Sequence, residues 1–229
     1  MLPVLDEEVL RHRIARRIAR EFEDGDVVNL GIGIPTLVSD HIPEGVRVTF
    51  QTENGVVGAG PKPPEEDLRF IGAGGRCLSV VPGGALIASD FSFGLIRGGH
   101  LDATVLGALQ VDQEANLANW WIPGKLVPGM GGAMDLVTGA KHVIVATTHT
   151  TKKGGIKLVK KCNLPLTGAG VVSLVVTEYA VFRFVDGQMV LEELAPGITE
   201  EDIREITEAE YVTSPDLGVM QGCEEEQQD

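Results

Sequence analysis

One carboxylate in this sequence stands where α/β proteins place their ligands. It belongs to Gln51-Thr52-Glu53-Asn54-Gly55, which continues a run, Val46–Phe50, of alternating apolar and polar residues. Such alternation predicts a half-buried strand, and Asn54-Gly55 readily adopts the positive φ angles of a tight turn. Glu53 is therefore expected at the carboxyl end of a strand, the edge at which open α/β sheets bind ligands. The plainer interpretation is a hairpin turn carrying a solvated glutamate.

Two glycine-rich segments are predicted to offer backbone N–H groups to an anion. The first, Gly31-Ile32-Gly33, lies between a short apolar strand and a helix expected from Thr36 to His41, and the first turn of a helix leaves N–H groups unpaired. A dinucleotide fingerprint is rejected there, because Thr36 replaces its last glycine and Pro35 interrupts it. The second, Gly131-Gly132-Ala133, precedes an apolar helix and suits an oxyanion or a thioester carbonyl.

The elements that must position these segments follow from periodicity and caps. We expect helices at 6–22, 91–96 and 199–206, the last with Thr199 as N-cap. Further strands are expected at 27–30, 77–81, 103–109, 143–147, 171–177, 181–184 and 189–191, with Pro82 ending the second of these and Asp186-Gly187 forming a hairpin turn.

Two basic clusters stand out in an acidic chain. Arginines 11, 13, 16, 17 and 20 lie on the first predicted helix, and we interpret them as a solvated face, with a partner-chain contact as the alternative. Lysines 152, 153, 157, 160 and 161 form either a solvated loop or a contact for a ligand's phosphates. We predict one domain over residues 1–218 and a disordered acidic tail over 219–229.

Composition limits the classes of function. The formal net charge is -14, which argues against a nucleic-acid partner, since phosphate binding needs a basic face. Three scattered cysteines give neither a zinc motif nor an even disulfide set, so we expect no metal site and a reducing cytoplasm. The first residues contain no apolar signal segment, and no apolar run reaches membrane-spanning length, so we expect no membrane contact.

Three stretches together carry a family resemblance: 29–35 (Asn-Leu-Gly-Ile-Gly-Ile-Pro), 52–55 (Thr-Glu-Asn-Gly) and 129–136 (Gly-Met-Gly-Gly-Ala-Met-Asp-Leu). In this order they resemble the B-type chain of class I 3-oxoacid CoA-transferases of the succinyl-CoA:3-ketoacid type. Further matches lie at 96–100, 117–120, 122–125, 161–162 and 164–168, so the likeness spans about Arg13 to Pro215. The departures are a shorter loop after Gly60-Pro61 and the acidic tail.

The resemblance implies an α/β fold, an open mixed or parallel sheet with flanking helices. It also implies that Glu53 is the nucleophile: its carboxylate attacks an acyl-CoA, expels CoA thiolate, and then carries CoA as a glutamyl thioester until an acceptor acid reverses the steps. Substrate and CoA contacts are expected from Asn54, Gly31, Gly33, Gly131, Gly132 and Ala133. Coenzyme A is a substrate in this scheme, and no separate cofactor is expected. The partner implied is an A-type subunit, in an α2β2 heterotetramer.

Two alternatives stay open. The same chemistry can serve another acid pair, such as acetoacetate with acetate or butyrate, or 3-oxoadipate with succinyl-CoA. A different class of protein, a non-catalytic homologue that binds a small acid or a sugar phosphate, can use the same fold. Glu53 favours the enzyme, because a binding module has no need of a carboxylate at that position.

Overall fold

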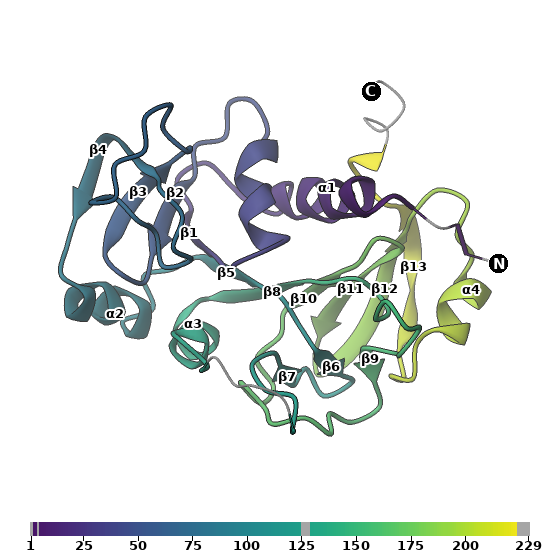
Figure 1. Ribbon diagram of the computed structural model, residues 1–229. Coiled ribbons are helices and arrows are strands. Elements are labelled where there is room, and N and C mark those ends of the chain that lie inside the picture. The colour runs from purple at the N-terminus through teal and green to yellow at the C-terminus, as the bar shows by residue number, and fades with distance from the viewer. Residues whose placement is uncertain (1, 4, 125–128, 224–229) are drawn as a thin grey trace.

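The computed structural model describes residues 2–3, 5–124 and 129–223 and shows a large mixed sheet with helices on both faces (Figure 1). The helices are α1 (Glu7–Ala19), the 3-10 helix η1 (Pro35–His41), α2 (Ser89–Arg97), α3 (Ala133–Gly139) and α4 (Glu200–Glu205). The strands are β1 (Val27–Leu30), β2 (Thr49–Thr52), β3 (Val56–Gly60), β4 (Ser79–Leu86), β5 (Ala103–Leu106), β6 (Gln110–Asp112), β7 (Leu117–Ala118), β8 (His142–Ala146), β9 (Leu158–Val159), β10 (Leu174–Val176), β11 (Ala180–Val185), β12 (Gln188–Leu194) and β13 (Val212–Val219). The predicted α/β class is confirmed.

The 10-stranded sheet has the order β13-β12-β11-β10-β8-β5-β1-β2-β3-β4. Its centre, from β10 to β2, is parallel, whereas β3, β4 and β11 run antiparallel to their neighbours. The chain passes from β1 to β2 on one side and later returns to β5 on the other side of β1. This reversal is a topological switch point, and the crevice outside the carboxyl ends of strands at such a point is where α/β sheets bind ligands.

Two pairs of helices cover the two faces of the parallel strands. Helix α1 packs on β8 and β10 and η1 on β1, while α3 packs on β5 and pairs with α2 across the opposite face (Figure 1). Central strands are consequently apolar on both faces, as in β5, where all four residues are buried. Smaller strands β7, β6 and β9 form a separate sheet.

The predicted cap of α4 and the predicted turn after β11 are confirmed. Thr199 forms a capping box with Asp202 at the start of α4, and Asp6, which was not predicted as a cap, caps α1 by accepting from Glu8 N at 2.9 Å. Asp186 and Gly187 both have positive φ angles, of 51° and 78°, which suit the turn between β11 and β12.

Several boundaries differ from the prediction: the first helix ends at Ala19, β5 at Leu106, and β10 begins at Leu174, and three further differences have a clear physical reason. The strand expected at Val46–Phe50 forms at Thr49–Thr52, because pairing with β1 joins Val27 to Thr49. Strand β4 continues through Pro82 to Leu86 instead of ending there, which an edge strand tolerates because one side makes no ladder bonds. Residues 219–223 belong to the fold and not to a disordered tail: Val219 ends β13, and Met220 and Cys223 are buried.

Some predicted features fall on residues that the structure does not describe. Residues 224–229 of the acidic tail, Lys125 of the 122–125 motif and Pro128 lie outside the described residues. Within the described part of the chain, no helix combines the length and the apolar character needed to cross a membrane.

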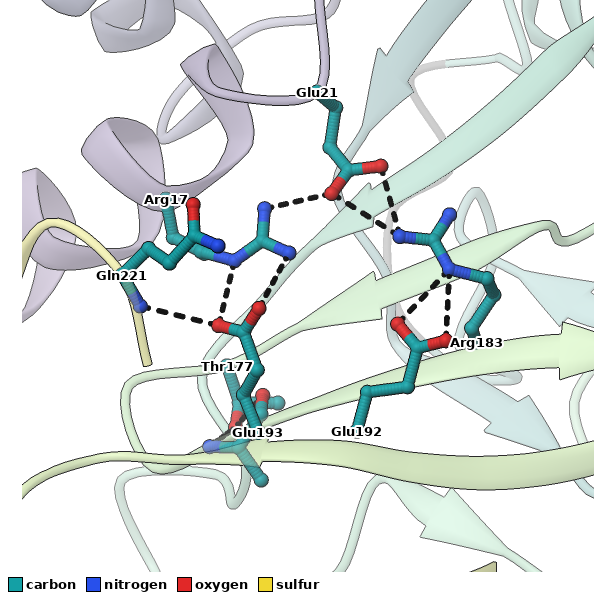
Figure 2. A network of polar contacts seen from close by, with 8 residues as sticks. Arg17, Glu21, Thr177, Arg183, Glu192, Glu193 and Gln221 are labelled. Carbon is teal, nitrogen blue, oxygen red and sulfur yellow. Dashed lines mark hydrogen bonds and ion pairs between the residues drawn. The ribbon is translucent and has the colours of Figure 1, made fainter. Parts of the chain in front are cut away.

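Three of the five arginines predicted to form a solvated face are not solvated, whereas Arg11 is half-buried and Arg20 is exposed. Arg13, Arg16 and Arg17 are buried, and Figure 2 shows Arg17 between two carboxylates. Arg17 donates to both oxygens of Glu193, at 2.8 and 2.9 Å, and to Glu21 at 2.7 Å. Glu21 also accepts from Arg183, at 3.0 Å, so the network ties α1 to β11 and β12. Burial disfavours the charge on Arg17, but the hydrogen bonds and charges of Glu193 and Glu21 outweigh it and raise the pKa of Arg17.

Candidate active site

Glu53 is the first residue after β2, in the turn that leads to β3. Strands β2 and β3 pair in antiparallel fashion, so the turn is a hairpin turn, and the carboxylate also stands at the carboxyl end of a strand of the parallel centre. The side chain is partly buried, not fully solvated. Gly55 completes the turn with a φ of 113°, a conformation that a residue with a side chain rarely adopts. Glu53 therefore lies both at the carboxyl end of a strand and in a hairpin turn, as the two interpretations of the sequence predicted. Only the expectation of a solvated side chain at Glu53 is wrong.

The glycine-rich segment Gly131-Gly132-Ala133, here called the cradle, approaches Glu53 through Gly132. Gly132 is the N-cap of α3, and a Cβ added to it would stand 3.1 Å from Glu53 Cγ and 3.2 Å from the Phe93 ring. Ala133 N–H already donates to Met130 O at 3.3 Å, whereas the hydrogen bonds of the described residues include none from the N–H groups of Gly131 or Gly132. Gly131 and Gly132 thus remain candidates for binding an oxyanion next to Glu53, and Ala133 does not.

Two contacts between α2 and α3 hold the cradle in place. Arg97 Nε of α2 donates to Asp135 Oδ1 of α3 at 2.7 Å, and within α2 the Arg97 guanidinium lies 5.7 Å from the centre of the Phe93 ring. At the other end of α3, Gly139 packs so closely that an added Cβ would be 2.1 Å from Ile96 O. A glycine is required there for the two helices to approach, and this approach sets the position of Gly132.

The loop after β1 lies at the same edge of the sheet, but it offers a ligand fewer free N–H groups than expected. Asn29 is in register with Gln51, which brings Gly31 to the end of the sheet where Glu53 stands. However, Gly31 N–H donates to Val105 O at 2.8 Å and so extends the ladder to β5 instead of facing a ligand. Gly33 has a φ of 96° and open space where a Cβ would lie. Of this loop, only Gly33 keeps the predicted role as a ligand contact.

Asn54 supports the turn and a neighbouring loop. Its side-chain oxygen accepts from Thr52 Oγ1 at 2.7 Å and its amide donates to Ile71 O at 2.6 Å. These bonds fix the segment around Ile71 beside the turn. A contact from Asn54 to coenzyme A stays a prediction.

The lysine-rich loop is mostly paired within the protein. Lys152 bonds Glu7 at 2.9 Å and Lys160 pairs with Glu210. Lys157 turns inward and donates to Thr147 and Thr148, and burial lowers its pKa despite the favourable charge of Glu178. These contacts favour a structural role over a phosphate site for the three lysines.

A cavity of about 370 Å³ lies at the opposite edge of the sheet, at the amino ends of β5, β8 and β10. Its charged groups already pair with each other or with neighbours: Lys141 with Asp102, and Arg183 with Glu21. In the described chain, no group of three His, Cys, Asp or Glu residues is placed to hold a metal ion. The Glu53 edge therefore carries the reactive arrangement.

A family model and named relatives match most of this chain. The model of the family described as coenzyme A transferase matches residues 11–205. The chain belongs to the coenzyme A transferase family. It is 54% identical, over 93% of its length and 98% of the relative's, to the beta chain of the acetate CoA-transferase of Escherichia coli K12. It is 48% identical, over 88% of its length and 98% of the relative's, to the B-type chain of the succinyl-CoA:3-ketoacid coenzyme A transferase of Helicobacter pylori 26695.

The fold of this CoA-transferase chain also has solved counterparts. The crystal structure of an acyl-CoA transferase (YdiF) apoenzyme from Escherichia coli O157:H7 aligns with a TM-score of 0.73 at 24% identity. The alignment covers 96% of this chain but 44% of that longer chain. The likeness confirms the predicted fold, and the family match confirms the predicted enzyme class.

Proposed function

We propose that this chain is the catalytic B-type subunit of a CoA-transferase that moves CoA between an acyl-CoA, such as succinyl-CoA, and a 3-oxoacid, such as acetoacetate. One observation carries the proposal: Gly132, the N-cap of α3, packs against Glu53, so the start of a helix and a carboxylate meet at the carboxyl edge of the parallel strands. A non-catalytic binding module has no need of this pairing.

The chemistry proceeds through Glu53 alone, with coenzyme A as a substrate and no separate cofactor. A Glu53 carboxylate oxygen attacks the thioester carbonyl; the carbon–sulfur bond breaks and CoA leaves as thiolate, giving an acyl-glutamyl anhydride. The thiolate then attacks the glutamyl carbonyl, the anhydride carbon–oxygen bond breaks, and the acid product leaves as its carboxylate. The acceptor acid repeats these steps in reverse, so the two half-reactions alternate.

The cradle supplies the stabilisation that each tetrahedral intermediate requires. Negative charge develops on one oxygen in each addition step. We assign its stabilisation to the N–H groups of Gly131 and Gly132, because Gly132 packs against Glu53. One such donor contributes about 3 kcal/mol to transition-state stabilisation. Glycine at 132 keeps this space open for the thioester.

The names of the relatives support two acid pairs. The Helicobacter pylori relative is named for succinyl-CoA and a 3-ketoacid, and the Escherichia coli relative for acetate. We favour the 3-oxoacid with succinyl-CoA and keep acetate as the second candidate. Initial rates with acetoacetate, acetate, butyrate and 3-oxoadipate, each against succinyl-CoA and acetyl-CoA, decide between them.

The active complex also requires an A-type subunit, in an α2β2 arrangement. Both relatives are named as subunits. Large apolar side chains are exposed on elements beside Glu53, notably Ile32 at 70% and Phe91 at 63%, and such surface is typical of a protein interface. The chain purified alone should transfer almost no CoA to acetoacetate, and full activity without a partner would contradict this part of the proposal.

The covalent step has a direct test. The assembled enzyme, given acyl-CoA without an acceptor acid, should accumulate CoA as a thioester on Glu53. Hydroxylamine or borohydride should then inactivate it, and peptide mass mapping should place the modification at Glu53. Glu53→Ala should abolish labelling and turnover, whereas Glu44→Ala, which removes an exposed carboxylate elsewhere, should change neither. An adduct on another residue would refute the mechanism.

A further inference from the structure

Three hydrogen bonds converge on one carbonyl immediately before Glu53. Thr52 O accepts from Gln51 Nε2 at 2.9 Å, from Ser92 Oγ at 3.0 Å and from Gly55 N at 3.0 Å. The donors come from β2, from α2 and from the turn itself. Because the Thr52 carbonyl and the Glu53 N–H share one rigid peptide plane, these bonds fix the plane from which the Glu53 side chain departs.

The donors are held by a second layer of polar contacts in the core. Gln51 Nε2 also donates to Ser92 Oγ at 2.7 Å, and Asn29 Nδ2 donates to Gln51 Oε1 at 3.0 Å. Asn29 and Ser92 are fully buried and Gln51 is 2% exposed. Asn29 Oδ1 is buried and makes no hydrogen bond among the described residues, although its amide makes two. Burying an oxygen without a hydrogen bond costs stability, and an apolar residue at position 29 would avoid that cost. Such departures from good core packing are typical of functional sites.

Among the residues that the structure describes, nothing polar restrains the Glu53 carboxylate directly, so its position depends on the support of its backbone. Within the described residues, no hydrogen bond or ion pair reaches the carboxylate, and its close neighbours are Gly132 and Phe93. The aim of the side chain is therefore set by its backbone. We propose that Asn29, Gln51 and Ser92 are positioning residues that hold the peptide before Glu53 and so direct its carboxylate at the thioester. This inference rests on the proposed function of Glu53.

The test measures the first half-reaction, since a misplaced nucleophile slows that step without weakening substrate binding. Ser92→Ala and Gln51→Leu are compared with the wild type in the assembled enzyme, by following the rate at which CoA appears on Glu53 after mixing with succinyl-CoA. We expect both variants to react about 10- to 100-fold more slowly, with KM for succinyl-CoA changed less than about twofold. Ser92→Thr keeps the hydroxyl and should retain more of the rate than Ser92→Ala.

Thr104→Val is the matched control. Thr104 is fully buried, lies in register with Asn29 on the neighbouring strand, and has no partner for its hydroxyl among the described residues. It should form the adduct at the wild-type rate. All rates are expressed per folded protein from circular dichroism, and Ser92→Ala, the smaller change, keeps the test valid if Gln51→Leu does not fold.

The outcomes separate this inference from the proposed function. If the wild type forms no adduct on Glu53, the proposed function is wrong. If the wild type labels normally and Ser92→Ala and Gln51→Leu label at the same rate, the positioning role is wrong. An equal loss of rate in Thr104→Val would also overturn it, because any buried polar change would then have the same effect.

Discussion

Gly132 touches Glu53: a Cβ at position 132 would stand 3.1 Å from Glu53 Cγ. The two residues come from separate motifs, one at the end of a strand and one at the start of a helix, and the fold joins them through the contact of α2 with α3. A side chain added at position 132 should therefore disturb Glu53 directly, and substitutions there test the role of the cradle.

Gly132→Val should lower turnover strongly while the protein stays folded. Its Cβ would crowd Glu53 and the Phe93 ring, and its branches would fill the space required by the thioester. Gly132→Ala should give an intermediate loss, since Phe93 can yield by a few tenths of an ångström. The measurement is kcat in the assembled enzyme, with the melting temperature as the control. Near-native turnover in Gly132→Val would move the oxyanion site away from this cradle.

Gly55→Ala should destabilise the protein. The residue has a φ of 113°, and an added Cβ would be 2.0 Å from the backbone Ile87 O, which cannot move without breaking strand pairing. Strain in the φ angle alone costs about 1–3 kcal/mol. Gly45→Ala is the control, because Gly45 has a φ of 88° but open space around its Cβ position. Urea unfolding should show a clearly larger loss for Gly55→Ala, and equal losses would show that the clash is relieved.

Arg17→Ala should reduce the free energy of unfolding by about 3–5 kcal/mol, since it leaves the buried Glu193 without its cation and leaves the half-buried Glu21 with Arg183 alone. Arg47→Ala is the matched control: Arg47 pairs with Asp24 on the surface, with 88% of its side chain exposed, and its loss should leave the urea midpoint almost unchanged. Similar midpoints for both variants would mean that the network in Figure 2 contributes no more than a surface pair.

The stability of the protein should fall as the pH drops below about 6.5, in part through His149. Burial, and then the charge of Lys157, lowers the pKa of His149 to about 3. In the unfolded chain His149 is protonated below about pH 6.5, whereas in the folded chain it stays neutral down to about pH 3. The contribution of His149 to the free energy of unfolding is therefore fully present above pH 6.5 and is lost as the pH falls toward 3. Over this range the free energy of unfolding falls by about 1.4 kcal/mol for each pH unit.

His149→Gln tests this dependence. The variant is expected to be less stable at pH 8, because His149 bonds both Thr177 and Thr207, but its urea midpoint should change less between pH 7 and pH 5 than that of the wild type. Equal slopes in the two proteins would show that His149 is not the titrating group.

Local signals in the sequence were sufficient for much of the fold. The Thr199 capping box, the Asp186-Gly187 turn and the turn at Glu53 each depend on residues within a few positions of one another, and each is confirmed. The family motifs also identified the cradle that the structure places beside Glu53.

Features that depend on distant residues could not be read in the same way. Arg17 has the appearance of a surface residue until Glu193, 176 positions away, is placed beside it. Likewise, nothing near Gly31 indicates that its N–H is used by Val105. The polar contacts under Glu53 left one trace in the sequence, since the amide of Asn29 interrupts an otherwise apolar strand.

The long separation between Arg17 and Glu193 also constrains how the chain is made. Helix α1 is synthesised long before Glu193, so its buried arginine acquires this partner only after the 176 positions that separate them have been added. The Gln221 N–H that bonds Glu193 at 3.1 Å arrives later still. Until then, the basic amphipathic helix α1 lies beside an incomplete parallel sheet without the carboxylate that pairs with Arg17. Contacts between residues so far apart in the sequence form slowly. Nascent chains that stop before residue 193 should therefore depend on chaperones, and release of the carboxyl-terminal strands should be the event that closes the fold.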